Sequence, residues 1–180
     1  MEVERDIADA EDWYETTGVT ALYEAFVDLL TEELGFDEVH ETYYEENADT
    51  GQFKTKIYAE KQLGKGGLYD IGSDTTLVLE FTYFLAHGPS EKEDGEFAQA
   101  RIQTANISIK VDMPGKDRWI DSLFRRIWFN LVYKDQFHRW VEVAEETMND
   151  FLNICRDFLG FEPVVGKARR LDYEPLEHSI

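Results

Sequence analysis

The spacing of apolar residues changes from that of strands to that of helices between Val111 and Trp119. In several segments up to Val111, apolar residues recur at every second position, which is the period of a strand with one buried face. From Trp119 onward they recur three and four positions apart, which is the period of an amphipathic helix. The change predicts a β-sheet that is followed in sequence by one or two long helices.

The segments before this change predict a helix and then several strands. Residues 18–34 have helical spacing, with Leu22, Phe26 and Leu30 in one apolar stripe, and Gly35 is suited to end the helix. Alternation predicts strands over 39–46, 52–62, 75–86 and 96–112, with a further short strand at 68–71 as an alternative.

Sequential strands joined by hairpins favour an antiparallel meander, and the sheet has one apolar and one polar face. The predicted fold class is therefore α+β with two layers. An N-terminal helix precedes an antiparallel meander of four or five strands, and one or two long C-terminal helices pack on one sheet face.

The last predicted strand changes its parity. Ala100 and Ile102 occupy even positions, whereas Ala105 and Ile107 occupy odd ones. A strand cannot keep both sets on one face without an extra residue, so we predict a β-bulge near Gln103–Thr104. A bulge there bends the sheet.

We predict one domain with two appendages. Residues 1–16 are interpreted as an acidic tail, residues 17–160 as a single α+β domain, and residues 161–180 as an irregular C-terminal arm that contains Pro163 and Pro175. Between Asp117 and Gly160 there is no Pro or Gly, which is typical of helix. Whether this region is one helix or two stays open.

The charge of the chain limits its partners. The formal net charge is −20, and residues 1–50 hold seventeen Asp or Glu against Arg5 alone. Such a chain repels nucleic-acid phosphates and anionic lipid, so we expect neither nucleic acid nor membrane as a partner. A single cysteine, Cys155, excludes an internal disulfide, and no leader-like segment is present, so a cytoplasmic location is expected.

No set of residues predicts catalysis or a cofactor. His138 and Glu142 stand one helical turn apart and are weak candidates for a metal, but a zinc site needs three or four ligands. Cys155 falls on an apolar helical stripe, where a thiol behaves as a small hydrophobic group. We therefore expect a protein that is not an enzyme, and a metal-assisted hydrolase is the weakest of our three hypotheses.

The helix predicted over 117–133 is apolar on two sides. One stripe faces the predicted core, and the residues on the other side are Arg125, Arg126, Phe129, Val132 and Tyr133. Arginine and aromatic residues are common anchors of protein interfaces. Our first hypothesis is a non-catalytic interaction module that acts through protein–protein contact or self-association. The alternative is a bend near Tyr133 that places this side under the next helix or the C-terminal arm.

The bent sheet suggests a second hypothesis. A curved antiparallel sheet around a long helix is able to enclose an apolar cavity, which binds small hydrophobic molecules. The residues expected to line it are Phe81, Tyr83, Ile107, Trp140 and Phe151. A filled core is the alternative.

Overall fold

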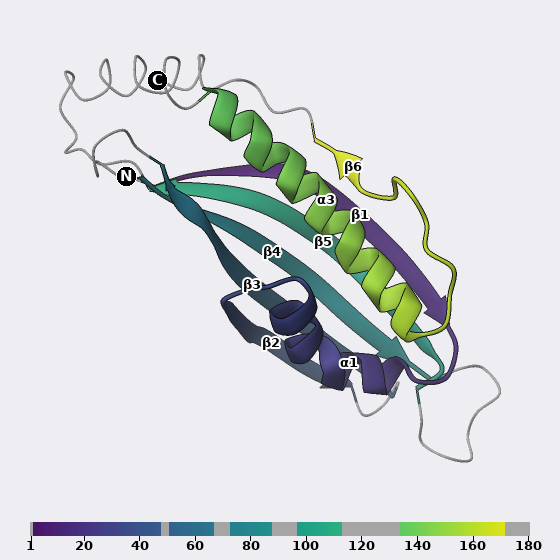
Figure 1. Ribbon diagram of the computed structural model, residues 1–180. Helices are drawn as coiled ribbons and strands as arrows, with labels where there is room; N and C mark the ends of the chain where they lie inside the picture. Colours follow the sequence, from purple (N-terminus) through teal and green to yellow (C-terminus); the bar gives the residue numbers. More distant parts are fainter. Residues whose placement is uncertain (1, 48–50, 67–72, 88–96, 113–133, 172–180) are drawn as a thin grey trace.

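The structure, a computed structural model, describes residues 2–47, 51–66, 73–87, 97–112 and 134–171. It is an α+β fold in which an antiparallel sheet is covered on one face by an N-terminal and a C-terminal helix (Figure 1). The predicted class is confirmed. The described part of the sheet has six strands rather than four or five. No helix in the described ranges is long and apolar enough to cross a membrane.

The elements follow one another in a simple order. The strands are β1 (Glu2–Glu15), β2 (Glu38–Asn47), β3 (Gln52–Gly66), β4 (Ser73–Ala86), β5 (Gln99–Asp112) and the two-residue β6 (Arg169–Arg170). The helices are α1 (Val19–Asp28), its π-helical continuation η1 (Leu29–Glu33) and α3 (Lys134–Phe158).

The strand order in space is β2-β3-β4-β5-β1-β6. Strands β2 to β5 form the predicted meander, since each pairs antiparallel with the next. Strand β1 then lies beside β5, with Glu2 opposite Asp112 and Glu15 opposite Gln99. Strand β2 consequently forms one edge of the sheet, and β6 adds a short strand beside β1 at the other.

The prediction of an acidic tail over residues 1–16 is wrong. Glu2–Glu15 form a fourteen-residue strand inside the sheet, and Ile7 and Tyr14 are fully buried. The pairing of β1 with β5 shifts register twice, between Asp6 and Ala8 and between Ala10 and Asp12. These shifts interrupt the alternation that marks a strand, which explains why the sequence pattern did not indicate one.

The predicted bulge is confirmed. Register shifts between Glu80 and Thr82 on β4, and between Ala10 and Asp12 on β1, both fall opposite residues 103–105 of β5. Thr104 has a φ of 51°, the left-handed conformation that an extra residue in a strand adopts. The sheet bends around the helices, as Figure 1 shows.

The core lies between the concave sheet face and the two helices. Phe26 of α1, Phe81 of β4 and Phe151 of α3 meet at its centre, with ring centroids 5.1 Å apart for Phe26–Phe81 and 4.6 Å apart for Phe81–Phe151. All three rings are almost completely buried. Each such ring removes a large apolar area from water, so this cluster ties the two helices to one sheet.

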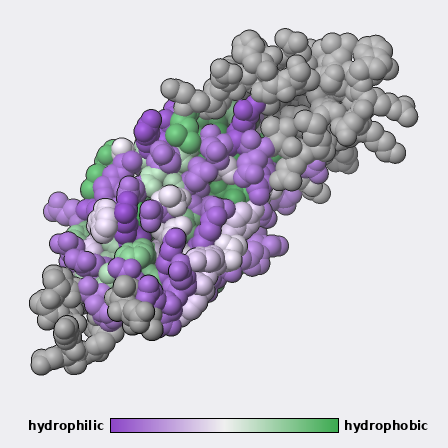
Figure 2. All heavy atoms as spheres, turned by 180° about the vertical axis from the view of Figure 1, so that it is seen from behind, coloured by the Kyte–Doolittle hydropathy of each residue, from purple (hydrophilic) through white to green (hydrophobic). Residues whose placement is uncertain are grey.

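The opposite sheet face is polar, as expected. It carries charged and hydroxyl side chains such as Glu4, Lys56, Glu80 and Lys110. Figure 2 shows this side of the molecule as mostly hydrophilic, with scattered apolar residues. The described helices therefore cover the other, apolar face.

The residues from Phe161 to Ala168, part of the arm that we predicted to be irregular, are outside any helix or strand. They run back along α3 before β6 pairs with β1 (Figure 1). Three side chains of α3 hold this segment, since Asn149 and Asn153 accept hydrogen bonds from Ala168 and Val164, and Arg156 donates one to the carbonyl of Glu162.

Candidate functional site

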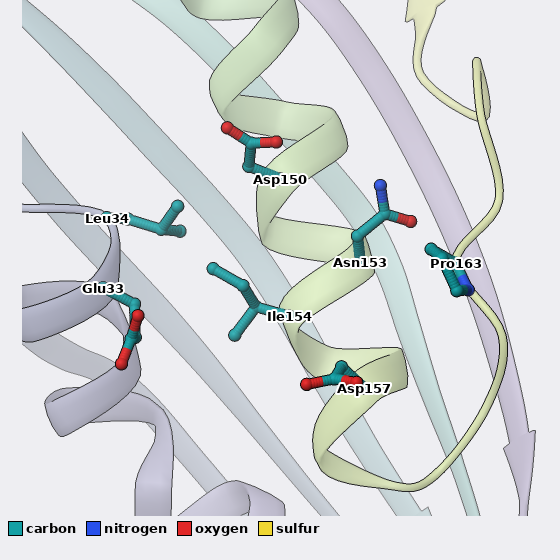
Figure 3. Close-up of a pocket in the computed structure, with 7 residues that line it drawn as sticks. All are labelled: Glu33, Leu34, Asp150, Asn153, Ile154, Asp157 and Pro163. Atoms are coloured by element: carbon teal, nitrogen blue, oxygen red, sulfur yellow. The ribbon is translucent and has the colours of Figure 1, made fainter.

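A pocket of about 310 Å³ opens between η1 and α3. Figure 3 shows side chains from the two helical walls around this space, with Pro163 on the returning C-terminal segment. Three of the lining residues are acidic, three are apolar and one is an amide: Glu33, Asp150, Asp157, Leu34, Ile154, Pro163 and Asn153. The pocket lies at the lower end of the size range of small-ligand sites.

The π-helical turn forms one wall. The Leu34 amide donates to the carbonyl of Leu29 five residues earlier, 3.2 Å away, instead of four. Gly35 then ends the helix with a φ of 67°. Lys61 of β3 fixes the end of this turn because its ammonium donates to the carbonyl of Leu34 at 2.8 Å. Short π-helical turns occur often at functional sites, where they displace side chains from the regular helical positions.

One face of α3 forms the second wall. Asp150, Asn153, Ile154 and Asp157 follow one another at intervals of three, one and three residues, so they line a single face of the helix. The opposite face contains Met148, Phe151 and Cys155, which are buried in the core. Packing of the core face therefore sets the direction of the pocket face.

A buried charge cluster fixes the third wall. Asp12 of β1 is 4 % exposed, and its carboxylate accepts from Arg156 of α3 at 3.1 Å and from Lys167 of the returning segment. Arg156 also holds the carbonyl of Glu162, the residue before Pro163. The segment that carries Pro163 is thus held at both ends against α3 and β1.

The acidic side chains of the pocket lack a counter-charge within the described ranges. Among the residues that the structure describes, Glu33, Asp150 and Asp157 form no ion pair, and Lys61 is engaged with a backbone carbonyl instead. Unpaired carboxylates beside the aliphatic groups of Leu34 and Ile154 create a negative potential over an apolar floor. This arrangement is suited to a cation with an apolar stem.

A second hollow, of about 380 Å³, lies on the outer sheet face. Its polar groups bind one another, since Asn106 donates to Asp6 at 2.7 Å and Ser108 donates to Glu4 at 2.9 Å. Glu80 forms an ion pair with Lys56. Most of these groups are already paired with one another, although the Oδ1 of Asn106 is buried without a hydrogen-bond partner in the described part of the chain. The pocket between η1 and α3 contains three carboxylates that form no ion pair among the described residues, so we consider it the better candidate site.

The residues predicted to line an apolar cavity are in the core. Phe81, Tyr83, Ile107, Trp140 and Phe151 are all buried, and the rings of Phe81 and Phe151 contact each other. The Tyr83 hydroxyl donates to the carbonyl of Val19 at 2.9 Å, and burial raises the pKa of this phenol. None of the five residues lines the pocket between η1 and α3.

The other predicted site residues divide into two groups. His138 and Glu142 are exposed on α3, and the described residues contain no group of three or more side chains able to hold a metal ion. The interface residues Arg125, Arg126, Phe129, Val132 and Tyr133 lie outside the described residues. The interface hypothesis for these residues therefore stays a prediction.

No protein-family model matches this sequence, and a search of curated proteins found no relative. Function is therefore inferred from the geometry of the chain itself.

The pocket wall on α3 leaves only a weak signal in the sequence. Asp150, Asn153 and Asp157 have helical spacing and lie beside the apolar stripe, a pattern that also fits an ordinary solvent-exposed helix face. Only the position of η1 opposite them turns this face into a pocket wall. That proximity depends on how both helices pack on the sheet.

Proposed function

We propose that the chain is a non-catalytic interaction module that binds a partner protein by capturing a Lys or Arg side chain in the pocket between η1 and α3. The observation that supports this proposal is the set of three carboxylates around Leu34 and Ile154 that form no ion pair with any described residue. The activity is protein–protein contact, as in the first hypothesis from the sequence, and the site lies between η1 and α3.

A long basic side chain suits both parts of the pocket. Its methylene groups pack on the aliphatic floor, while its charged end reaches the carboxylates of Asp150, Asp157 or Glu33. Phosphate, nucleic acid and fatty acids carry the wrong charge for this lining. An uncharged apolar molecule leaves the three carboxylates without a partner.

The rigid walls favour binding of a partner without a large rearrangement. Lys61 fixes the end of η1, and the contacts of Asn153 and Arg156 fix the segment around Pro163. A preformed site loses less conformational entropy on binding than a mobile one.

The proposal is tested by NMR titration of the labelled protein with Nα-acetyl-lysine N-methylamide and with its uncharged norleucine analogue. The lysine probe is expected to shift the amide signals of residues 33–34 and 150–157, and the norleucine probe is not. In the double variant Asp150→Asn, Asp157→Asn, affinity for the lysine probe falls by about tenfold, because two exposed ion pairs are together worth about 1–2 kcal/mol.

Glu142→Gln is the matched control, since Glu142 is an exposed acid on the same helix that does not line the pocket. Its affinity for the lysine probe should equal that of the wild type. Equal weakening by the control variant, or equal shifts from both probes, would show that the pocket does not recognise a cation.

A further inference from the structure

The edge strand β2 has an unusual combination of charge and aromatic residues. It is the last strand of the described sheet, and nine of its ten residues are exposed. Four of the ten are glutamates, at positions 38, 41, 45 and 46. Between them lie Tyr43 and Tyr44, whose exposed fractions are 46 % and 55 %.

Three of the four glutamates of β2 accept hydrogen bonds from hydroxyl groups, and the fourth, Glu38, lies 3.2 Å from the imidazole of His40. Tyr43 donates to Glu45 at 2.6 Å and Tyr44 donates to Glu46 at 3.1 Å, in each case two residues along the same strand. Glu41 accepts from Tyr23 of α1 at 3.1 Å and from Thr55 of β3. No Lys or Arg among the described residues forms an ion pair with any of the four.

The two faces of this edge repeat the same pattern. The register with β3 places Tyr43 opposite Lys56 and Glu45 opposite Lys54 on the polar side of the sheet. On the other side, Tyr44 lies opposite the buried Thr55 and its ring meets Phe53 at 4.9 Å. An added strand would therefore meet a tyrosine and a glutamate on each face.

Edge strands are often guarded against unwanted pairing by charge or by a bulge, and β2 has both. Its register with β3 shifts between Glu41 and Tyr43. Protection against unwanted strand pairing does not require exposed aromatic rings, however. Tyrosine is enriched among the residues that contribute most of the binding energy at protein interfaces. Beyond the shift, the stretch Tyr43–Asn47 pairs regularly with β3, so its outer backbone edge is regular as well.

We propose that Tyr43–Asn47 of β2 binds an extended, Lys- or Arg-rich segment of a partner protein as an additional strand of the sheet. The partner's backbone pairs with the outer edge of β2, and its basic side chains lie against the glutamates and over the tyrosine rings. A second copy of this chain is disfavoured as the occupant, because it would bring Glu45 and Glu46 close to the same carboxylates.

This proposal concerns a different surface from the pocket, and its test separates backbone pairing from simple charge attraction. Three peptides are titrated against the labelled protein: Ac-KTKTKTK-NH2, the same peptide N-methylated at alternate residues, and Ac-ETETETE-NH2. The first is expected to bind and to slow hydrogen exchange of the amides of residues 43–47. N-methylation removes strand pairing and keeps the charge, so affinity is expected to fall about tenfold or more.

The variant Glu45→Gln, Glu46→Gln should weaken binding of the lysine peptide about tenfold, whereas Glu24→Gln, Asp28→Asn, which removes the same charge from α1, should not. In Asp150→Asn, Asp157→Asn the amide signals of residues 43–47 should respond to this peptide as in the wild type, whereas any signals of the pocket residues 33–34 and 150–157 should respond less, so failure at β2 is distinct from failure of the pocket. Equal affinity for the N-methylated peptide overturns the proposal. Protection of residues 43–47 that rises with protein concentration alone also overturns it, since a second copy would then occupy the edge.

Discussion

The guanidinium of Arg156 lies 3.1 Å from the carboxylate of Asp12, which is 144 residues away in the chain. This contact joins β1 to α3, and Lys167 binds the same carboxylate from the returning C-terminal segment. A single buried acid thus connects three parts of the molecule that the sequence separates.

Asp12→Ala should lower the free energy of unfolding by about 3–5 kcal/mol, because it leaves two cations without their buried partner. Urea unfolding followed by circular dichroism measures the change. Asp9→Ala is the control, since Asp9 lies on the same strand and has no ion pair among the described residues. A decrease in the free energy of unfolding of less than about 1 kcal/mol for Asp12→Ala would mean that water solvates Arg156 and Lys167 about as well as the Asp12 carboxylate does.

Thr104→Gly should raise the free energy of unfolding by about 0.5–1 kcal/mol. Thr104 has a φ of 51°, a conformation that costs a β-branched residue energy and that glycine adopts freely. The substitution also removes the hydrogen bond from the Thr104 hydroxyl to Thr82, at 3.3 Å. Thr104→Ala removes the same bond but keeps a Cβ, so it should not stabilise the protein. Thermal unfolding of the three proteins compares the two effects.

Cys155 should be unreactive in the folded protein. Burial raises the pKa of its thiol, and this residue of α3 is only 1 % exposed. At pH 8 the reaction with Ellman's reagent should be about a thousandfold slower in buffer than in guanidinium, because the thiol is reached only when the core opens. A fast reaction of the native protein would contradict the packing of α3 against the sheet.

Tyr23 should make the protein less stable at alkaline pH. Burial and the neighbouring Glu41 carboxylate raise the pKa of its phenol to about 12, whereas an unfolded tyrosine titrates near 10. Between these values the unfolded state loses the proton first, so the free energy of unfolding falls as pH rises from about 10 to 12. Tyr23→Phe should reduce this slope, and absorbance titration at 295 nm should show one phenol fewer near pH 12.

The sequence predicted those parts of the fold that depend on neighbours in the chain. The alternation around Phe81 and the helical stripe through Phe151 each lie within one element, and both predictions are confirmed. The parity change before Ala105 even located the bulge, because an extra residue leaves a trace in the pattern itself.

The parts that were missed depend on distant residues. Two register shifts in β1 hid a strand that only its pairing with β5 stabilises. The pocket arises where Glu33 of η1 and Asp150 of α3 are brought together by separate contacts with the sheet. Neither residue has a local feature that distinguishes it from a solvated acid, so the pattern alone does not indicate a site.

The position of β1 between β5 and β6 affects how the protein is made. When β1 leaves the ribosome, the strand that it will pair with, residues 99–112, has not yet been synthesised. Seven of the fourteen residues of β1 are Asp or Glu. Repulsion between these charges disfavours pairing of the unpaired β1 with other nascent chains. We therefore expect the acidic charge of β1, which resembles a tail in sequence, to disfavour incorrect pairing of this strand until β5 exists.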